Sequence, residues 1–165
     1  MDNNLIFSPE QAVSWILSSV SKKDINGEFG DGLSDLFILT GSLDTLQSKV
    51  INLLKTKTIK EGMDFEFLEV DSSSINRDYV NNLRNPNGTD GGFIVVKDFS
   101  TFAAIPDINS QIYILSKIMR NPFGLECTGW HIIFLEDTTE KDKWWSNSCI
   151  HYFQQKSFLK CWYIE

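Results

Sequence analysis

From residue 35 onward, short apolar segments alternate with segments of helical periodicity. The segment Gly92–Val96 is apolar almost without interruption, which is typical of a strand that is covered on both faces. The strands that we expect span residues 35–40, 65–70, 92–96, 130–135 and 158–164. Because parallel neighbours need a crossover helix between them, this alternation predicts a three-layer α/β/α fold around a mostly parallel five-stranded sheet.

An additional helix is predicted near the N-terminus. Ser8 is placed as its N-cap, Pro9 as its first residue, and Gln11 as the partner of Ser8 in a capping box. Residues 22–32 are polar and contain glycines, so we interpret them as a linker. We therefore expect a single domain over residues 1–165, with an N-terminal helix and linker at 1–32 and an α/β core at 33–165.

The charge of the chain excludes several partners. Its 22 acidic and 15 basic residues give a net charge of −7, which repels phosphate backbones and anionic lipids. No apolar run approaches the roughly 20 residues of a membrane span. The three cysteines and two histidines match no zinc-finger spacing, so we expect reduced thiols and no metal site. We predict a cytoplasmic protein that binds neither membranes nor nucleic acid non-specifically.

The junction after the first predicted strand has the spacing of a phosphate-binding loop. A Walker A loop reads G-x-x-x-x-G-K-[ST], and here Gly41 and Ser48 match its first and last positions. Leu46 and Gln47 stand where the second glycine and the lysine are required. Without that lysine the β- and γ-phosphates are not neutralised. The sequence therefore predicts no cofactor, or at most weak ATP binding through the Gly41 amides and the Ser48 hydroxyl, with Leu46 in the core.

These features resemble the core of AAA+ and related P-loop ATPases over roughly residues 33–165. Residues 94–98 stand where a Walker B strand ends, and residues 132–137 stand at the strand that carries sensor 1. The phrase at 93–99 is similar to the inactive N-terminal domain of some bacterial and plastid AAA+ ATPases. However, Lys97-Asp98 replaces the Walker B acidic pair, an acid replaces the sensor 1 asparagine, and no helical lid follows. The resemblance thus implies the topology of this family without its ATP hydrolysis, in a relic or an excised domain of a larger ATPase.

Three acids follow predicted strands, namely Asp71, Asp98 and Asp137. The carboxyl ends of parallel strands meet at one edge of a sheet, where such acids could hold Mg²⁺ for hydrolysis of phosphate esters. Acids at these positions also commonly begin turns and cap helices. Both interpretations are open at this point, so a phosphatase or nuclease is the alternative function.

Aromatic residues crowd the end of the chain. Trp144 and Trp145 are adjacent on a helix expected over residues 140–154, and successive helical residues differ by about 100°, so both cannot easily face inward. We expect one of them at a surface that contacts a protein partner or another copy. The leading hypothesis is a non-catalytic domain that acts in protein–protein interaction or assembly, for example as the regulatory domain of an ATPase. An accessory protein of a phage or mobile element that inhibits a host complex is a third alternative.

Overall fold

The computed structural model describes residues 6–20, 36–118, 130–138, 152 and 159–165. Its sheet has six strands in the order β1-β6-β2-β5-β4-β3, and every neighbouring pair is parallel. The strands are β1 (Ile6–Phe7), β2 (Leu36–Gly41), β3 (Phe65–Asp71), β4 (Gly91–Lys97), β5 (Trp130–Asp137) and β6 (Leu159–Ile164). The predicted α/β fold with a parallel sheet is therefore confirmed, and β1 is a two-residue strand that was not predicted.

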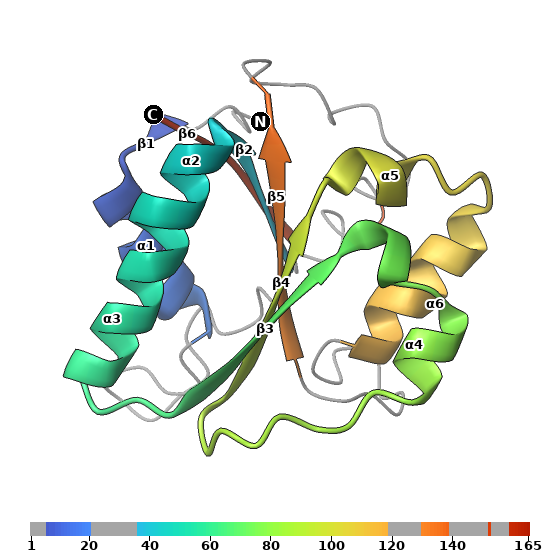
Figure 1. Ribbon diagram of the computed structural model, residues 1–165, viewed down its shortest axis with the longest axis horizontal. Helices are drawn as coiled ribbons and strands as arrows, with labels where there is room; N and C mark the ends of the chain where they lie inside the picture. The colour runs from blue at the N-terminus through green and yellow to red at the C-terminus, as the bar shows by residue number, and fades with distance from the viewer. Residues whose placement is uncertain (1–5, 21–35, 119–129, 139–151, 153–158) are drawn as a thin grey trace.

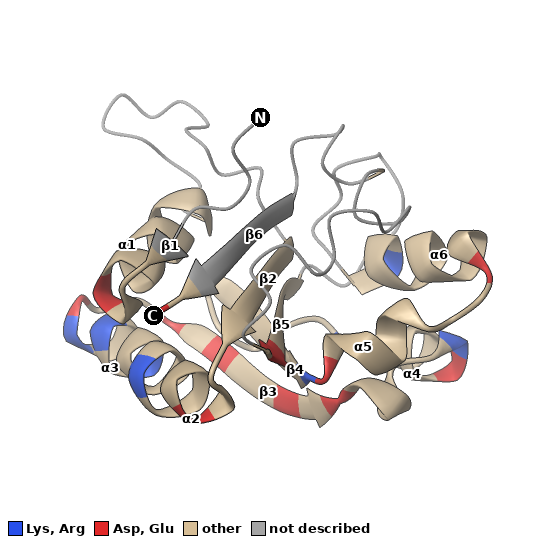
Figure 2. Cartoon of the chain, turned by 90° about the horizontal axis from the view of Figure 1, so that it is seen from above, with Lys and Arg blue, Asp and Glu red and all other residues tan. Residues whose placement is uncertain are grey.

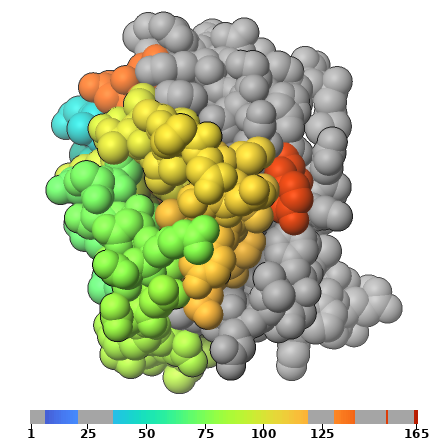
Figure 3. Space-filling view, turned by 90° about the vertical axis from the view of Figure 1, so that its right-hand side faces the viewer, coloured from blue at the N-terminus to red at the C-terminus, as the bar shows by residue number. Residues whose placement is uncertain are grey.

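Helices cover both faces of this sheet (Figures 1 and 2). On one face lie α1 (Pro9–Val20) and a continuous helix made of α2 (Leu43–Thr45), the π-helical segment η1 (Leu46–Ile51) and α3 (Asn52–Lys60). The other face carries α4 (Arg77–Asn81), α5 (Phe99–Ala103) and α6 (Ile108–Ile118). Figure 3 shows the atoms of these three segments next to one another on one face of the molecule. The short 3-10 turn η2 (Ser72–Ser74) precedes α4 in the chain. The helix expected at 140–154 lies outside the described residues, apart from Tyr152.

The start of α1 follows the predicted capping box. The amide of Gln11 donates to Ser8 Oγ at 3.2 Å, and the amide of Ser8 donates to Gln11 Oε1 at 2.9 Å. Two amides that the helix leaves unpaired are thus satisfied reciprocally. None of the helices in the described part of the chain combines the length and hydropathy that a membrane-spanning helix requires.

The sheet separates two hydrophobic clusters, one under each helical layer. Leu36 and Ile38 of β2 point to the first cluster, under α4–α6, whereas Phe37 and Leu39 point to the second, under α1 and α3. All four side chains are buried. A strand that is buried on both faces needs apolar residues at every position, which explains why the continuous apolar runs of the sequence predicted the central strands.

Candidate functional site

The connection between β2 and the following helix is Ser42 alone. β2 ends at Gly41, and α2 begins at Leu43. The helix then continues through η1 and α3 to Lys60. The motif placed Gln47 and Ser48 at the end of a phosphate-binding loop, but both lie inside the helix, in η1. Residues 41–48, all of them described, therefore contain no loop that could wrap around a phosphate group.

Three of the first four amides of this helix are already bonded within the chain. The Leu43 amide donates to Asp137 Oδ1 at 3.2 Å, and the Thr45 amide donates to Ser42 Oγ at 3.5 Å. The amide of Leu46 donates to the Ser42 carbonyl at 2.9 Å. Free amides and the helix dipole are what attract phosphate to a helix N-terminus. Here the anion at that position is the carboxylate of Asp137, from the end of β5.

The residues predicted to bind residual nucleotide have local partners. Ser48 is exposed, and its hydroxyl donates to the carbonyl of Asp44 at 2.6 Å within the same helix. Leu46, at the position of the missing glycine, is fully buried in the second cluster, as predicted. Its burial fixes the helix in the place where a phosphate loop would run.

Gly41 has a structural requirement of its own. Its φ is +152°, and a Cβ built on it would lie 2.7 Å from the backbone oxygen of Ile164 at the end of β6. Only glycine permits both this conformation and this close approach. The glycine that matched the first position of the motif is therefore needed for the packing of β2 against β6.

The three predicted metal-binding acids lie at the carboxyl ends of β3, β4 and β5, as the sequence suggested. Asp98 has a φ of +66° and accepts a hydrogen bond from Thr101 Oγ1 at 2.6 Å, beside the start of α5. Asp137 accepts from the Leu43 amide. Asp71 lines an open hollow of about 310 Å³ together with Glu69, Val70, Ser74 and Lys97. Asp137 thus caps a helix through its side chain, whereas Asp98 stands at the N-cap position of α5 without a capping hydrogen bond from its side chain.

These acids are not gathered into a metal site. Among the described residues, which include all three acids, no group of three or more His, Cys, Asp or Glu side chains is placed to hold a metal ion. Lys97 is the register partner of Asp71 and lines the same hollow, so a positive charge already lies beside that carboxylate. The arrangement offers no set of oxygen ligands of the kind that Mg²⁺ needs.

Glu136, beside Asp137, makes a contact that sequence reasoning missed. Its side chain is buried and accepts from the Ser100 amide at 3.1 Å and from Ser100 Oγ at 2.5 Å. The carboxylate therefore ties the end of β5 to the first turn of α5. This acid, in the strand that was compared with the sensor 1 strand, thus has a positioning role in the fold.

Trp144 and Trp145 lie outside the described residues, so the predicted aromatic contact surface stays a prediction. His131 is described, and it is fully buried in β5. Its ring centroid is 5.3 Å from that of Phe93. Cys127, Cys149 and His151, which were compared with zinc ligands, also lie outside the described residues.

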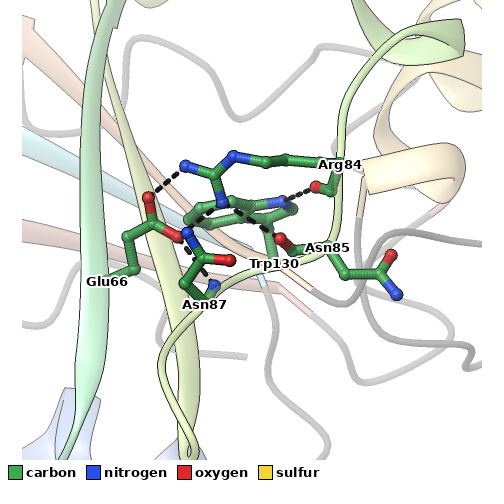
Figure 4. A network of polar contacts seen from close by, with 5 residues as sticks. All are labelled: Glu66, Arg84, Asn85, Asn87 and Trp130. Carbon is green, nitrogen blue, oxygen red and sulfur yellow. Dashed lines mark hydrogen bonds and ion pairs between the residues drawn. The ribbon is translucent and has the colours of Figure 1, made fainter.

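The most strongly perturbed carboxylate of the described residues is that of Glu66, near the start of β3 and so away from the acids at the strand ends. Figure 4 shows its contacts. Glu66 is bridged to the Arg84 guanidinium, with Arg84 Nη1 donating to Glu66 Oε1 at 2.7 Å and Nη2 contacting Oε2. The Asn87 amide also donates to Oε1, at 2.8 Å. These bonds, with that from Arg84 the largest cause, lower the pKa of Glu66 from its ordinary 4.5 to about 2.

Trp130 extends this network into the core. Its indole Nε1 donates to the Arg84 carbonyl at 2.8 Å, and the Arg84 guanidinium carbon lies 5.8 Å from the centre of the Trp130 ring. A Cβ on Gly92 would come within 2.4 Å of the same ring. Because its donors and acceptors are bonded to one another, the network holds the connection between α4 and β4 against the sheet.

We expect the stability of the protein to fall as the pH is lowered from about 4.5 towards about 2. The pKa of Glu66 is lower in the folded chain than its ordinary value. The stabilisation by its ionised form is therefore fully present above the unfolded-state pKa and is lost as the pH falls through the folded-state pKa. Urea unfolding of wild type and Glu66→Gln at a series of pH values measures this effect.

The difference in the free energy of unfolding between these two proteins should be constant near neutral pH and shrink across that acidic window. Glu61→Gln removes an exposed carboxylate at the end of α3 and serves as the matched control. A difference between wild type and Glu66→Gln that does not change with pH would contradict the assignment.

Comparison with known proteins supports the fold alone. No protein-family model matches the chain, and no curated protein sequence matches it. Among solved structures, the chain is similar to the Aeropyrum pernix ORC2 protein in its ADP form, at 12% identity and a TM-score of 0.50, over 95% of this chain and 46% of that one. It is also similar to ORC2 in its ADPNP-ADP complexes, at 13% identity and a TM-score of 0.51, over 94% of this chain and 46% of that one.

ORC2 is a protein of the AAA+ ATPase family, and this chain spans less than half of its length. The predicted resemblance to AAA+ proteins is thus confirmed as a distant structural similarity, and the architecture is P-loop NTPase-like. At these identities the likeness gives no information about activity.

Proposed function

We propose that this chain is a degenerate, non-catalytic AAA+-like domain that acts in protein–protein interaction or assembly, with copies of itself or as the regulatory domain of an ATPase. The observation that carries the proposal is the junction between β2 and α2. The strand and helix of the ATPase frame are retained, whereas the phosphate-binding loop between them is reduced to Ser42. A domain with this frame and without this loop is suited to contacts rather than to chemistry.

Electrostatics at the junction also oppose nucleotide binding. A phosphate group at the start of α2 would compete with the Asp137 carboxylate for the Leu43 amide, and the two negative charges would repel each other. Rebuilding a loop through residue 46 would also unwind the helix and expose the buried Leu46 side chain, which costs about 2 kcal/mol. Gln47 would supply no positive charge to offset these costs.

A magnesium-dependent hydrolase of phosphate esters has less support. The Asp98 carboxylate accepts from Thr101 Oγ1, the Asp137 carboxylate accepts from the Leu43 amide, and Asp71 faces Lys97 across the ladder. Phosphatase or nuclease activity that Asp98→Asn abolishes would overturn the non-catalytic proposal.

We expect the whole chain to show no saturable binding of a fluorescent ATP analogue with Mg²⁺ at nucleotide concentrations up to about 1 mM, where a complex with a Kd of 1 mM is worth only about 4 kcal/mol. ATP should also leave the melting temperature unchanged, because a ligand that does not bind the folded state cannot stabilise it. Fluorescence anisotropy and thermal denaturation measure the two effects.

Two variants make this experiment specific. Asp137→Asn removes the competing charge without lengthening the junction, so it should not create nucleotide binding. Micromolar ATP affinity in the wild type that is lost in Ser48→Ala would contradict the proposal, because it would show a functional phosphate site at the motif.

The interaction part of the proposal needs a separate measurement. Recovery of proteins by the tagged whole chain, followed by crosslinking, should identify an ATPase subunit or the chain itself in direct contact. A chain that recovers no partner and is monomeric would contradict this part.

A further inference from the structure

One border of the sheet is formed by a long strand, β3, whose outer side is unpaired among the described residues. β3 is the last strand in the sheet order, and its seven residues all have register partners in β4. In the described part of the chain, no strand pairs with its other side, and Figure 2 shows β3 along the border of the sheet. The opposite border ends in the two-residue strand β1. A seven-residue edge with unpaired backbone groups is a template for another strand.

Both faces of β3 offer apolar surface next to this edge. Phe65 and Phe67 pack, partly buried, against the second cluster, and Leu68 and Val70 pack against the first. A strand added beyond β3 would therefore find apolar neighbours above and below the sheet. Cross-strand contacts of this kind are the main source of stability between paired strands.

The acids of β3 do not leave the edge with unbalanced charge. Glu66 is bridged to Arg84, and Glu69 lies 3.5 Å from Lys55 Nζ. The third acid, Asp71, has Lys97 as its ladder neighbour. Charged side chains at a strand edge usually discourage pairing with another chain. In β3 each of these charges has a base beside it, although the chain as a whole is strongly acidic.

The order of residues in β3 is compatible with its own antiparallel copy. With a twofold axis at Leu68, perpendicular to the sheet, Leu68 lies opposite Leu68 of the second copy and Phe67 lies opposite Glu69. Glu66 then lies opposite Val70, and Phe65 opposite Asp71. No two like charges are opposed, and each residue meets a residue that points to the same face of the sheet.

We propose that β3 pairs antiparallel with β3 of a second copy of this chain, centred on Leu68, so that one sheet continues through both molecules. The inference rests on the proposed function in assembly, and it names the surface and the partner. Each helical layer continues on its own side, because the axis is perpendicular to the sheet. The contact is isologous and closes after two copies, as in most symmetric dimers.

Analytical ultracentrifugation of the whole chain over a range of micromolar concentrations tests this proposal. We expect an apparent mass of twice that of the chain, with Leu68→Lys weakening the association about tenfold or more, because the substitution opposes two lysines and removes the central apolar pair. Val70→Lys is the matched control. It removes a partly buried apolar side chain from the same face but lies opposite Glu66, so its effect should stay within about threefold.

Circular dichroism must show that both variants remain folded. If either is unfolded, cysteine crosslinking gives an independent result. Side chains directly opposite each other in an antiparallel pair have Cβ atoms about 4.5–5.5 Å apart, which is within disulfide range at the lower end. Oxidised Leu68→Cys should therefore form a covalent dimer well above the wild-type background, which includes any crosslinks through the three native cysteines. The variants Glu66→Cys and Val70→Cys place their cysteines opposite each other in the proposed pair. Each variant alone should therefore show only background crosslinking, and the two should crosslink when they are mixed.

A monomer at every concentration would overturn this inference. A dimer that Leu68→Lys and Val70→Lys weaken equally would also overturn it, and so would a dimer that does not show the expected cysteine crosslinks. A β3 edge that instead binds an unrelated extended peptide while the chain stays monomeric would also overturn it. None of these outcomes would affect the absence of nucleotide binding, which is measured separately. Conversely, ATP binding would contradict the non-catalytic proposal whether or not the dimer forms.

Discussion

Replacement of Gly41 by alanine is expected to lower the free energy of unfolding by about 3 kcal/mol. The residue has a φ of +152°, which is strained for any residue with a Cβ, and the new Cβ would lie 2.7 Å from the Ile164 backbone oxygen. That oxygen belongs to the end of β6 and cannot move without disturbing the sheet. Urea denaturation followed by circular dichroism measures the loss.

Gly62→Ala is the matched control for the conformational part of this cost. Gly62 also has a positive φ, of +72°, but nothing lies within 4 Å of the position of its Cβ. We expect this variant to lose only about 1 kcal/mol. Equal losses in the two variants would show that the contact with β6 is not what requires Gly41.

Trp130→Ala is expected to cost about 4 kcal/mol, the largest loss among the variants considered. The side chain is fully buried in the first cluster, so its removal leaves a cavity under α4 and α6. The Arg84 carbonyl would also lose its hydrogen bond from the indole. The expected loss is large enough to threaten folding in a domain of ordinary stability, and it is measured by urea denaturation at 25 °C.

Trp130→Phe separates the two contributions. The phenyl ring keeps much of the packing but cannot donate to the Arg84 carbonyl, so we expect a loss of about 1–2 kcal/mol. A phenylalanine variant as unstable as the alanine variant would show that the hydrogen bond, and not the packing, dominates.

The strands were predictable because of how they are buried. β2, β4 and β5 lie inside the sheet and are covered on both faces, which requires the continuous apolar runs that the sequence displays. β1 and α5 were not predicted, since two and five residues are too short to establish a periodicity. Their position depends on tertiary contacts.

At the candidate site the spacing of Gly41 and Ser48 is that of a phosphate-binding loop, whereas the structure has a continuous helix that begins at Leu43. The sequence also contained the competing signal, because Ser42 is a good N-cap and Leu46 and Val50 recur at helical spacing. Helix formation prevailed since it buries these apolar side chains.

The contacts of Asp137 with Leu43 and of Glu66 with Arg84 could not be read from the sequence. They join residues 94 and 18 positions apart, and they depend on the order and register of the strands. The sequence supplied the acids at the strand ends, but only the folded sheet shows which donors they meet.

The length of the β2–α2 junction has a consequence for protein engineering. Replacing Leu46 by glycine and Gln47 by lysine would reproduce the residues of the motif without its geometry, because a single residue separates the strand from the helix. A version of this domain that responds to nucleotide would require a longer connection between β2 and α2. It would also require removal of the Asp137 carboxylate from the first amide of the helix. Point mutations alone would not produce such a nucleotide response.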